Sequence, residues 1–378
     1  MERNVAMGNG EDGVVSLREP VVRLAANPIV TADMVNDVWR EPQLQVVTVH
    51  NAGAAVVAGE TVLLFRSHLR CGVSVLGVAR SPDGVSGWRV DDHPALIPAT
   101  RPDRFGDNVD TAAVVDMESG GVEDARINTI DGTFAITYSA YHERVKNRVR
   151  VALATTDDFR VFTRYGSMSD ADMRNVVVFP ERIAGRYVGL FRPNDSLAGD
   201  TGGAFTRIVS GRTNDFRFGP WHFDEDPVMR TGAGPSAFSD KIGPGAPPIR
   251  TRHGWLHIFH GVRTTMDGNP YVLGVAFHDI EDPSNVRMSS IPILFPSAAD
   301  CRRAETDYVH VPNVVFCCGA IRRPDGTLVL YYGGNDTVLN VGFSHEDVLA
   351  ELCDRYGQDP LTGRLGYSLG NGSRPGSQ

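Results

Sequence analysis

The feature that most constrains the fold is a pattern that occurs five times: a turn containing glycine, followed by an alternating strand rich in aromatic residues. The five turn glycines are Gly59, Gly132, Gly185, Gly254 and Gly326, separated by roughly fifty to seventy residues. Repetition of one sheet unit at such an interval is typical of a β-propeller, whereas a β-sandwich does not repeat the same turn in this way. The sequence therefore predicts an all-β fold, a five-bladed β-propeller.

The rest of the chain divides into a central domain and two terminal extensions. We expect an N-terminal arm over residues 1–20, loose up to about Leu17, a propeller catalytic domain over 21–345, and a C-terminal helix with a flexible tail over 346–378. Hydrophobic residues make up 42% of the 378 residues, which is enough for a full core. Only two stretches have helical character, namely Ala32–Val38 and residues 346–356, the second with Ser344 as a candidate N-cap.

Composition argues against several classes of protein. The net charge of -9 and the isoelectric point near 5.7 disfavour a general nucleic-acid binder. No apolar run has membrane-spanning length, and the N-terminal residues lack the apolar segment of a signal peptide. The five cysteines are scattered without metal-ligand spacing. These features favour a cytoplasmic protein with reduced thiols, no metal site, no nucleic-acid partner and no membrane partner.

A propeller places its site on the central axis, so polar residues next to the repeated strands are candidates for function. The third and fourth repeats supply four basic or ionisable side chains, Arg174, Arg192, Lys241 and His260. Arginine offers a bidentate fork and lysine a point charge, which together suit an oxyanion such as phosphate. Taken singly, Arg192 could instead form an ion pair between blades, and His260 could be a buried core histidine.

The first, second and fifth repeats supply acids and hydrogen-bonding groups: Asn51, Arg66, Glu123, Asp124 and Asp336. Carboxylates beside an amide and a guanidinium suit a sugar, because sugar hydroxyls both donate and accept hydrogen bonds. A sugar pocket next to a phosphate pocket, with one acid between them, describes phosphorolysis of a glycosidic bond. Phosphate is already an anion, so this reaction needs an acid but no base that activates water.

The candidate acid belongs to the stretch Gly120-Gly121-Val122-Glu123-Asp124-Ala125-Arg126-Ile127. The glycine pair allows close approach of the backbone where a strand begins, which would display the two acids beside Arg126 at the mouth of a sheet. Taken alone, the stretch could equally be a surface turn with a capping Asp and a solvated Glu–Arg pair.

Three histidines lie close together in the fourth repeat. On one strand, His253 and His257 would lie on one face and His260 on the other. This separation argues against a metal site formed by the three side chains.

Seven groups of residues carry a family resemblance, which runs from about residue 27 to about residue 347. They are His50-Asn51-Ala52-Gly53-Ala54, Ala79-Arg80-Ser81-Pro82-Asp83-Gly84, Gly121-Val122-Glu123-Asp124-Ala125-Arg126-Ile127, Ala152-Leu153-Ala154-Thr155-Thr156, Val178-Phe179-Pro180-Glu181, Lys241-Ile242-Gly243 with Pro247-Pro248-Ile249, and Gly254-Trp255-Leu256 through His260-Gly261-Val262. Together they make the chain resemble glycoside hydrolase family 130, the inverting β-mannoside phosphorylases.

The resemblance implies a five-bladed β-propeller that cleaves a β-mannoside with inorganic phosphate as co-substrate, without another cofactor, and releases α-D-mannose 1-phosphate. Asp124 matches the catalytic acid, which in this family passes its proton through the mannose 3-hydroxyl. The phosphate ligands of the family match Arg174, Arg192, Lys241, His260 and Tyr271. The sugar-binding positions match Asn51, Arg66 and Asp336, with Glu123 beside them.

Two alternatives to a phosphorylase stay open. One is a β-mannosidase using water, with Glu181 or Glu123 as the second carboxylate. The other is a non-catalytic carbohydrate-binding propeller, because propellers serve many functions. The hydrolytic branch of the family lacks much of the basic cluster, so the four retained side chains favour the phosphorylase.

The acceptor side is the least defined part of the prediction. Residues 101–110 and the loop 195–203 are expected to shape it, but they indicate neither the linkage, β-1,2 or β-1,4, nor the leaving sugar. Ala125 stands where many members of the family have proline, which should relax that turn without removing the acid. A homo-oligomer is an open alternative to a monomer.

Overall fold

The computed structural model describes residues 4–6, 13–145, 149–195, 205–232, 236–266, 268–301 and 311–358. Within these ranges the protein is nearly all β, with few helices, as the repeats predicted. The helical elements are α1 (Ala32–Val38), α2 (Thr111–Met117), α3 (Glu346–Arg355) and the 3-10 turns η1 (Pro42–Leu44) and η2 (Ala298–Asp300).

The strands form one small hairpin sheet and four larger sheets. The hairpin sheet pairs β1 (Asn4–Ala6) with β2 (Val14–Ser16). The nine-stranded sheet contains β4 (His50–Val57), β5 (Glu60–His68), β6 (Ser74–Ser81), β7 (Arg89–Val90), β8 (Arg104–Phe105), β9 (Gly121–Ile130), β10 (Thr133–Tyr141), β11 (Val149–Thr156) and β12 (Thr163–Ser167). A single parallel bridge, Ser74 to Gly121, joins its two halves, which are antiparallel except for the short parallel pairing of β8 with β12.

The other three sheets are antiparallel. One contains β13 (Met173–Val178), β14 (Tyr187–Pro193), β15 (Arg207–Thr213), β16 (His222–Phe223) and β17 (Met229–Arg230). The next contains β18 (Lys241–Pro244), β19 (Ile249–Thr251), β20 (Gly254–Val262), β21 (Tyr271–His278) and β22 (Val286–Met288). The last contains β23 (Val315–Arg322), β24 (Thr327–Gly334), β25 (Val338–His345) and β3 (Val22–Arg23).

The five predicted glycine turns are confirmed, since each opens a strand or precedes it by one or two residues, and each has the left-handed backbone that favours glycine. Their φ angles are 86° at Gly59, 76° at Gly132, 77° at Gly185, 120° at Gly254 and 92° at Gly326. The strands that follow are β5, β10, β14, β20 and β24. The repeat in the sequence is therefore a repeat of one local structure.

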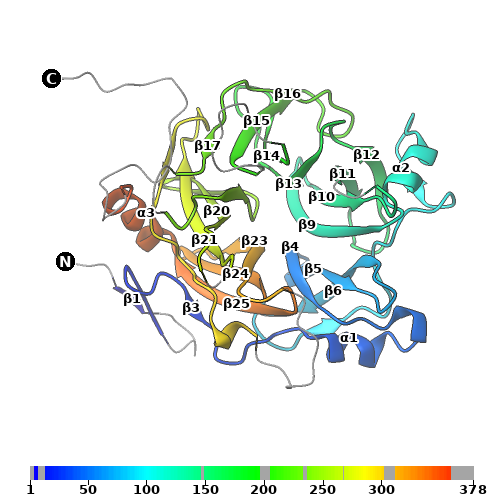
Figure 1. The fold of residues 1–378 in the computed structure, drawn as a ribbon, viewed down its shortest axis with the longest axis horizontal. Coiled ribbons are helices and arrows are strands. Elements are labelled where there is room, and N and C mark those ends of the chain that lie inside the picture. Colours follow the sequence, from blue (N-terminus) through cyan, green and yellow to red (C-terminus); the bar gives the residue numbers. More distant parts are fainter. Residues whose placement is uncertain are drawn as a thin grey trace.

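The sheets lie around a common centre, with β4, β9, β13 and β23 close to it (Figure 1). β4 contacts both β9 and β23, β9 contacts β13, and β13 contacts β18. The approach of β4 to β9 is very close, because a Cβ atom on Gly53 would lie 2.9 Å from the carbonyl oxygen of Ala125. Polar side chains on these strands are thus brought toward one central region.

A β-bulge interrupts three of these central strands at the same place. In β4 the strand pairing shifts register between His50 and Gly53, and in β13 it shifts between Arg174 and Val177. In β9 the shift lies between Glu123 and Arg126, opposite Thr137 to Ser139 of β10. The residue inserted at each bulge has a positive φ: 49° at Asn51, 53° at Asp124 and 56° at Asn175. Bulges re-aim side chains, and Asn and Asp tolerate this backbone better than other non-glycine residues.

The N-terminal segment packs against the last sheet. β3 pairs with β25, and Ser344 donates a hydrogen bond to the carbonyl of Pro20. Val15 is fully buried and Leu17 is 7% exposed. The expectation of a loose arm is therefore wrong for the described residues from 13 onward, because their apolar side chains join a core cluster.

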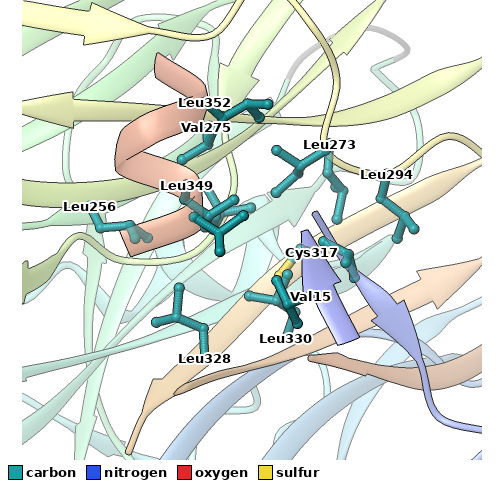
Figure 2. Close-up of a cluster of buried hydrophobic side chains, with 14 of the residues drawn as sticks. Val15, Leu256, Leu273, Val275, Leu294, Cys317, Leu328, Leu330, Leu349 and Leu352 are labelled. Carbon is teal, nitrogen blue, oxygen red and sulfur yellow. The ribbon is translucent and has the colours of Figure 1, made fainter. Parts of the chain in front are cut away.

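That core cluster joins distant parts of the chain (Figure 2). Val15 lies with Leu349 and Leu352 of α3 and with side chains of the fourth and fifth sheets, such as Leu273 and Leu330. Both terminal elements thus cover the sheet faces instead of hanging free.

The two predicted helices are present, but one cap is wrong and one helix was missed. α1 has the predicted bounds, whereas α3 begins at Glu346 with His345 as N-cap, whose side chain accepts a hydrogen bond from the Asp347 amide. The hydroxyl of Ser344 donates to the carbonyl of Pro20 instead. The missed helix is α2, which Asp110 caps by accepting a hydrogen bond from the Ala113 amide. Its sequence, Thr-Ala-Ala-Val-Val-Asp-Met, has no apolar period of 3.6 that would mark a helix.

Candidate active site

A cavity of 170 Å³ lies where the bulged strands meet. Its lining residues are Asn51, Arg66, Asp124, Arg174, Asn175, Arg192, Tyr271, Val311, Val314, Phe316 and Asp336. Seven of the ten predicted site residues are among them. The other three, Glu123, Lys241 and His260, contact the lining residues from behind.

Asp124 is the carboxylate at the centre of this arrangement, and its residue is 7% exposed. Its Oδ1 atom accepts hydrogen bonds from Asn51 Nδ2 at 2.9 Å and from Arg66 Nη1 at 3.0 Å. Burial by itself would raise the pKa of Asp124, but the charges of Arg66 and Arg126 and the amide of Asn51 hold it well below its usual range. Asp124 is therefore an anion near neutral pH.

Two further acids surround the same guanidinium. Glu123 accepts a hydrogen bond from Arg66 Nη2 and another from Ser74 Oγ, both at 2.8 Å. Burial raises the pKa of Asp336 to about 7, with Arg66 opposing the rise and the charges of Asp124 and Glu123 reinforcing it. Near neutral pH, Asp336 is thus partly protonated.

Basic side chains form the other side of the cavity. Arg174 and Arg192 are direct cross-strand partners in β13 and β14. Arg192 Nη1 lies 3.1 Å from His260 Nε2, and Lys241 Nζ lies 3.5 Å from Tyr271 Oη. These contacts bring the five predicted phosphate ligands into one cluster, although only three of them line the cavity.

The cationic cluster is partly desolvated. Burial, with help from the charge of Arg174, lowers the pKa of Arg192 to about 9. Burial and then the charges of Arg192 and Arg126 lower the pKa of His260 well below its usual range. His260 is thus a neutral imidazole that accepts the hydrogen bond from Arg192. An anion entering the cavity would relieve the repulsion between the two arginines.

Four lining residues were not predicted from the sequence: Asn175, Val311, Val314 and Phe316. Asn175 is 3% exposed, and its Oδ1 atom has no hydrogen-bond partner among the described residues. Asn175 occupies the same bulge position as Asn51 and Asp124, which only the strand pairing reveals. The other three residues form an apolar wall, for which the sequence carried no comparable signal.

The histidines of the fourth repeat do not gather around one point. His253 contacts Asp347 at 2.7 Å, while His257 contacts His278 at 3.1 Å. His260 faces Arg192, on the opposite side of the strand from His257, as the alternation predicted. In the described ranges, no group of three or more His, Cys, Asp or Glu side chains could hold a metal ion.

Two segments were expected to shape the acceptor side, residues 101–110 and the loop 195–203. Residues 101–110 contribute no lining residue. Most of the loop 195–203 lies outside the described residues; its first residue, Asp195, accepts a hydrogen bond from Arg207.

A larger hollow of 580 Å³ lies away from the centre, beside Asp91 and Arg160. Its carboxylate Asp91 is already paired with Arg80 at 3.1 Å. This hollow holds none of the predicted site residues.

The fold and the cavity define the class of protein. A buried acid held by an amide and a guanidinium suits sugar hydroxyls, and the facing cations suit an anion. In a nearly all-β frame, this is the combination of a glycoside-processing enzyme. The chain belongs to glycoside hydrolase family 130, because the family model described as β-1,4-mannooligosaccharide phosphorylase matches residues 20–355. The family expected from the motifs is thereby confirmed.

Characterised relatives span nearly the whole chain. The chain is similar to a 1,2-β-oligomannan phosphorylase of Thermoanaerobacter sp. (strain X514), with 30% identity over 328 residues, 84% of this chain and 95% of the relative. It is also similar to a 4-O-β-D-mannosyl-D-glucose phosphorylase of Bacteroides fragilis, with 26% identity over 366 residues, 95% of this chain and 89% of the relative.

A solved structure gives the same assignment. The β-1,2-mannobiose phosphorylase of Listeria innocua, in complex with β-1,2-mannobiose, has a TM-score of 0.71 and 25% identity. The match covers 89% of this chain and 99% of that one. In the described parts of the chain, none of the helices has the length and apolar character needed to cross a membrane.

Proposed function

We propose that this protein catalyses inverting phosphorolysis of a β-mannoside, giving α-D-mannose 1-phosphate and the shortened sugar. The observation that carries the proposal is one cavity that joins the buried acid Asp124 to the arginines Arg174 and Arg192. The named relatives act as phosphorylases on mannosides with different linkages. The proposal therefore names the reaction and leaves the linkage and the leaving sugar open.

We also propose that the four larger sheets form a five-bladed β-propeller. Each of five mainly antiparallel units contains one of the five glycine turns, and the nine-stranded sheet counts as two units because only one parallel bridge joins its halves. Successive contacts run around the centre: β4 contacts β9, β9 contacts β13, β13 contacts β18, and β23 contacts β4. This arrangement accounts for the meeting of side chains from all five repeats.

In the proposed reaction, a phosphate oxygen attacks the anomeric carbon of mannose while the bond from that carbon to the glycosidic oxygen breaks. Arg174, Arg192, Lys241 and Tyr271 bind and orient the phosphate, and His260 supports Arg192. Asp124 supplies the proton that the departing oxygen takes up, through the mannose 3-hydroxyl. Asn51, Arg66, Asp336 and the unpartnered amide of Asn175 bind the sugar.

The low pKa of Asp124 fits an acid that takes up its proton only when phosphate and the mannoside are bound. Phosphate brings negative charge into a site with little water, and a nearby like charge raises the pKa of a carboxyl group. Sugar hydroxyls that draw Asn51 away from Asp124 would raise it further. Because the acid must be protonated, turnover is expected to fall as pH rises through its pKa in the complex.

The proposal is tested by incubating the protein with β-1,2- and β-1,4-mannobiose, with and without inorganic phosphate. We expect mannose 1-phosphate to appear only when phosphate is present. Asp124→Asn should lose nearly all turnover with its melting temperature almost unchanged. Equal sugar release with and without phosphate would overturn the proposal.

A second variant separates the two halves of the cavity. Arg192→Ala should raise the KM for phosphate by about 100-fold or more, because a charge-assisted bidentate contact is lost, and should change the KM for the mannoside far less. Parallel weakening of both substrates would contradict the division into a phosphate side and a sugar side.

Hydrolysis by water is the less supported candidate. Glu181, one proposed second carboxylate, is half exposed, pairs with Arg250 and does not line the cavity. Glu123, the other, is held by Arg66 and Ser74. Neither acid is free to activate water at the centre. The non-catalytic alternative would predict sugar binding without any turnover. The cytoplasmic location and the oligomeric state stay predictions from the sequence.

A further inference from the structure

Arg126 is the residue whose role the proposed reaction does not yet use. It lies on β9, two residues after Asp124, and is 1% exposed. It is absent from the residues that line the cavity. A side chain of this length, buried at the centre of the molecule and behind the catalytic acid, needs a physical reason to be there.

The guanidinium of Arg126 connects three sheets. Nη1 donates to the carbonyl oxygen of Asp124 at 2.6 Å, in its own sheet. Nε and Nη2 donate to the carbonyl oxygens of Gly245 at 3.2 Å and Pro244 at 3.4 Å, at the end of β18. The guanidinium carbon also lies 5.5 Å from the centre of the Phe316 ring on β23.

These partners are unusual for a buried arginine. A buried charge normally pairs with a carboxylate, because burying it unpaired is costly. Among the described residues, Arg126 forms no ion pair, and its hydrogen bonds all go to main-chain carbonyls. Its planar fork therefore fixes the backbone of two separate strands relative to each other, which a flexible lysine could not do.

The two strands carry the two halves of the reaction. Asp124 sits at the β9 bulge with a left-handed backbone, and its own carbonyl is one of the atoms that Arg126 holds. β18 begins at Lys241, and a Cβ atom on its Gly243 would lie 2.8 Å from Arg192 Cδ. A shift between β9 and β18 would therefore change the distance from the acid to the phosphate-binding side chains.

We propose that Arg126 is a positioning residue that sets the spacing between the acid Asp124 and the phosphate-binding strand β18. This inference rests on the proposed phosphorolysis and adds a residue to it. Arg126 also acts through its charge, which contributes to lowering the pKa of Asp124 and that of His260. Arg126 thus influences both the acid Asp124 and His260, the histidine that supports Arg192.

The test compares Arg126→Lys and Arg126→Gln with the wild type and with Arg164→Lys. Arg164 is a matched control, since it is 3% exposed and bonded to the buried Glu118 and to the carbonyl of Ile97, outside the cavity. The measurements are the melting temperature, kcat, the KM for β-mannobiose, the KM for phosphate, and the ratio of free mannose to mannose 1-phosphate.

For both Arg126 variants we expect kcat to fall by about 100-fold, because a displacement of roughly 1 Å between reacting groups has that effect. The KM for β-mannobiose should change less than about 3-fold, because the sugar contacts are intact. The KM for phosphate and the share of free mannose should both rise. Arg164→Lys should lower the melting temperature without any of these changes.

The outcomes separate this inference from the proposed function. If the wild type needs phosphate, and either Arg126 variant that folds has the kcat and product ratio of Arg164→Lys, only the positioning role is wrong. If neither variant folds while Arg164→Lys does, Arg126 is a purely structural residue and the inference is also overturned. If the wild type itself releases mannose without phosphate, both the inference and the proposed function fail.

Discussion

At the residue scale, the centre of the site depends on three side chains placed by the same backbone irregularity. Asn51, Asp124 and Asn175 each occupy a β-bulge with a left-handed φ. Without the bulge, the regular alternation of the strand would aim these side chains away from the centre. The residue types Asn and Asp therefore serve two purposes, since they tolerate the backbone and also supply the polar group.

Asn175 allows these two purposes to be separated. Asn175→Gly keeps the left-handed backbone and removes the amide, so we expect a stability within about 1 kcal/mol of the wild type. The KM for β-mannobiose should rise by about 10-fold or more, because a buried polar contact to the substrate is lost. Asn175→Ala should show the same loss of affinity and, in addition, a lower melting temperature from backbone strain. An unchanged KM in both variants would remove Asn175 from the site.

Asp336 should show a trade-off between stability and function. Its folded pKa, about 7, lies above the ordinary value, so the folded state resists ionisation. This cost is absent below about pH 4, grows as pH rises toward 7, and is complete above 7. Asp336→Asn should therefore stabilise the protein at pH 8, on the order of 1 kcal/mol for a partly accessible group, and have no such effect near pH 4.

The same variant should raise the KM for the mannoside, because the amide cannot accept two sugar hydroxyls as the carboxylate can. Thermal unfolding at several pH values and steady-state kinetics measure the two effects. A stabilisation that is equal at all pH values would show that the charge of Asp336 is not its cause.

At the element scale, strands were far more predictable than what interrupts them. Alternation and a glycine turn indicate strands such as β10 and β24, because the pleat and the left-handed turn are local requirements. The bulges were not predicted, since a bulge depends on the partner strand and leaves no local pattern. For that reason Asp124 was recognised from its motif, whereas Asn175, with the same backbone, was missed. The apolar wall of Val311 and Val314 depends on a contact between distant segments and was equally invisible.

The pairing of β20 with β21 contains a second pH-sensitive element, remote from the site. His278 Nδ1 lies 2.7 Å from the carbonyl oxygen of Pro283, which can only accept, so this nitrogen carries the proton. Its Nε2 atom then accepts from His257 Nδ1 at 3.1 Å. Burial lowers the pKa of His278 to about 4, and burial followed by the charge of His278 lowers that of His257 well below its usual range. Both imidazoles are neutral in the folded protein.

Stability should consequently fall as pH drops below about 6.5, because the unfolded chain takes up protons that the folded pair refuses. The expected loss is roughly 1 kcal/mol for each histidine between pH 7 and pH 5.5. His278→Gln should flatten this dependence of the melting temperature on pH, even if it lowers the temperature overall. His93→Gln is the control, since its exposed imidazole should leave the dependence unchanged. Equal slopes in the wild type and His278→Gln would contradict the assignment.

At the scale of the whole molecule, the two ends of the described chain both pack against the sheet formed by β23, β24 and β25. β3, near the N-terminus, is the outer strand of the sheet formed by β23, β24 and β25. α3 follows β25 directly and packs with Val15 in the core cluster. Contacts between residues more than 300 positions apart, such as Ser344 with Pro20, therefore hold the last sheet to the first segment. If the sheets form the proposed propeller, these contacts close its ring, and the molecule should unfold as one unit because loosening them exposes the core on both sides.

Asn27 provides a sharp test of this closure. Its side chain imitates a strand partner of β25: Nδ2 donates to the carbonyl oxygen of Val341 at 2.8 Å, and Oδ1 accepts from the Val341 amide at 2.9 Å. Asn27→Ala would leave the buried Val341 amide unpaired, while the Val341 carbonyl would keep only its hydrogen bond from the Leu24 amide. We therefore expect a loss of about 1–3 kcal/mol in the free energy of unfolding. Asn285→Ala, at an exposed position whose amide makes no comparable contact, should stay within about 0.5 kcal/mol of the wild type.

Urea unfolding followed by fluorescence and by circular dichroism distinguishes closure of the whole molecule from local fraying. If the closure is global, the midpoint for Asn27→Ala falls, the slope is unchanged, and the two probes give the same transition. An early separate transition in one probe would mean that the N-terminal segment detaches alone, and the sheets would then form a ring that does not need its N-terminal strand. Activity provides a second measure, since Asp336 follows β24 in the sheet that Asn27 closes, and a global closure predicts that turnover is lost together with the folded state and not before it.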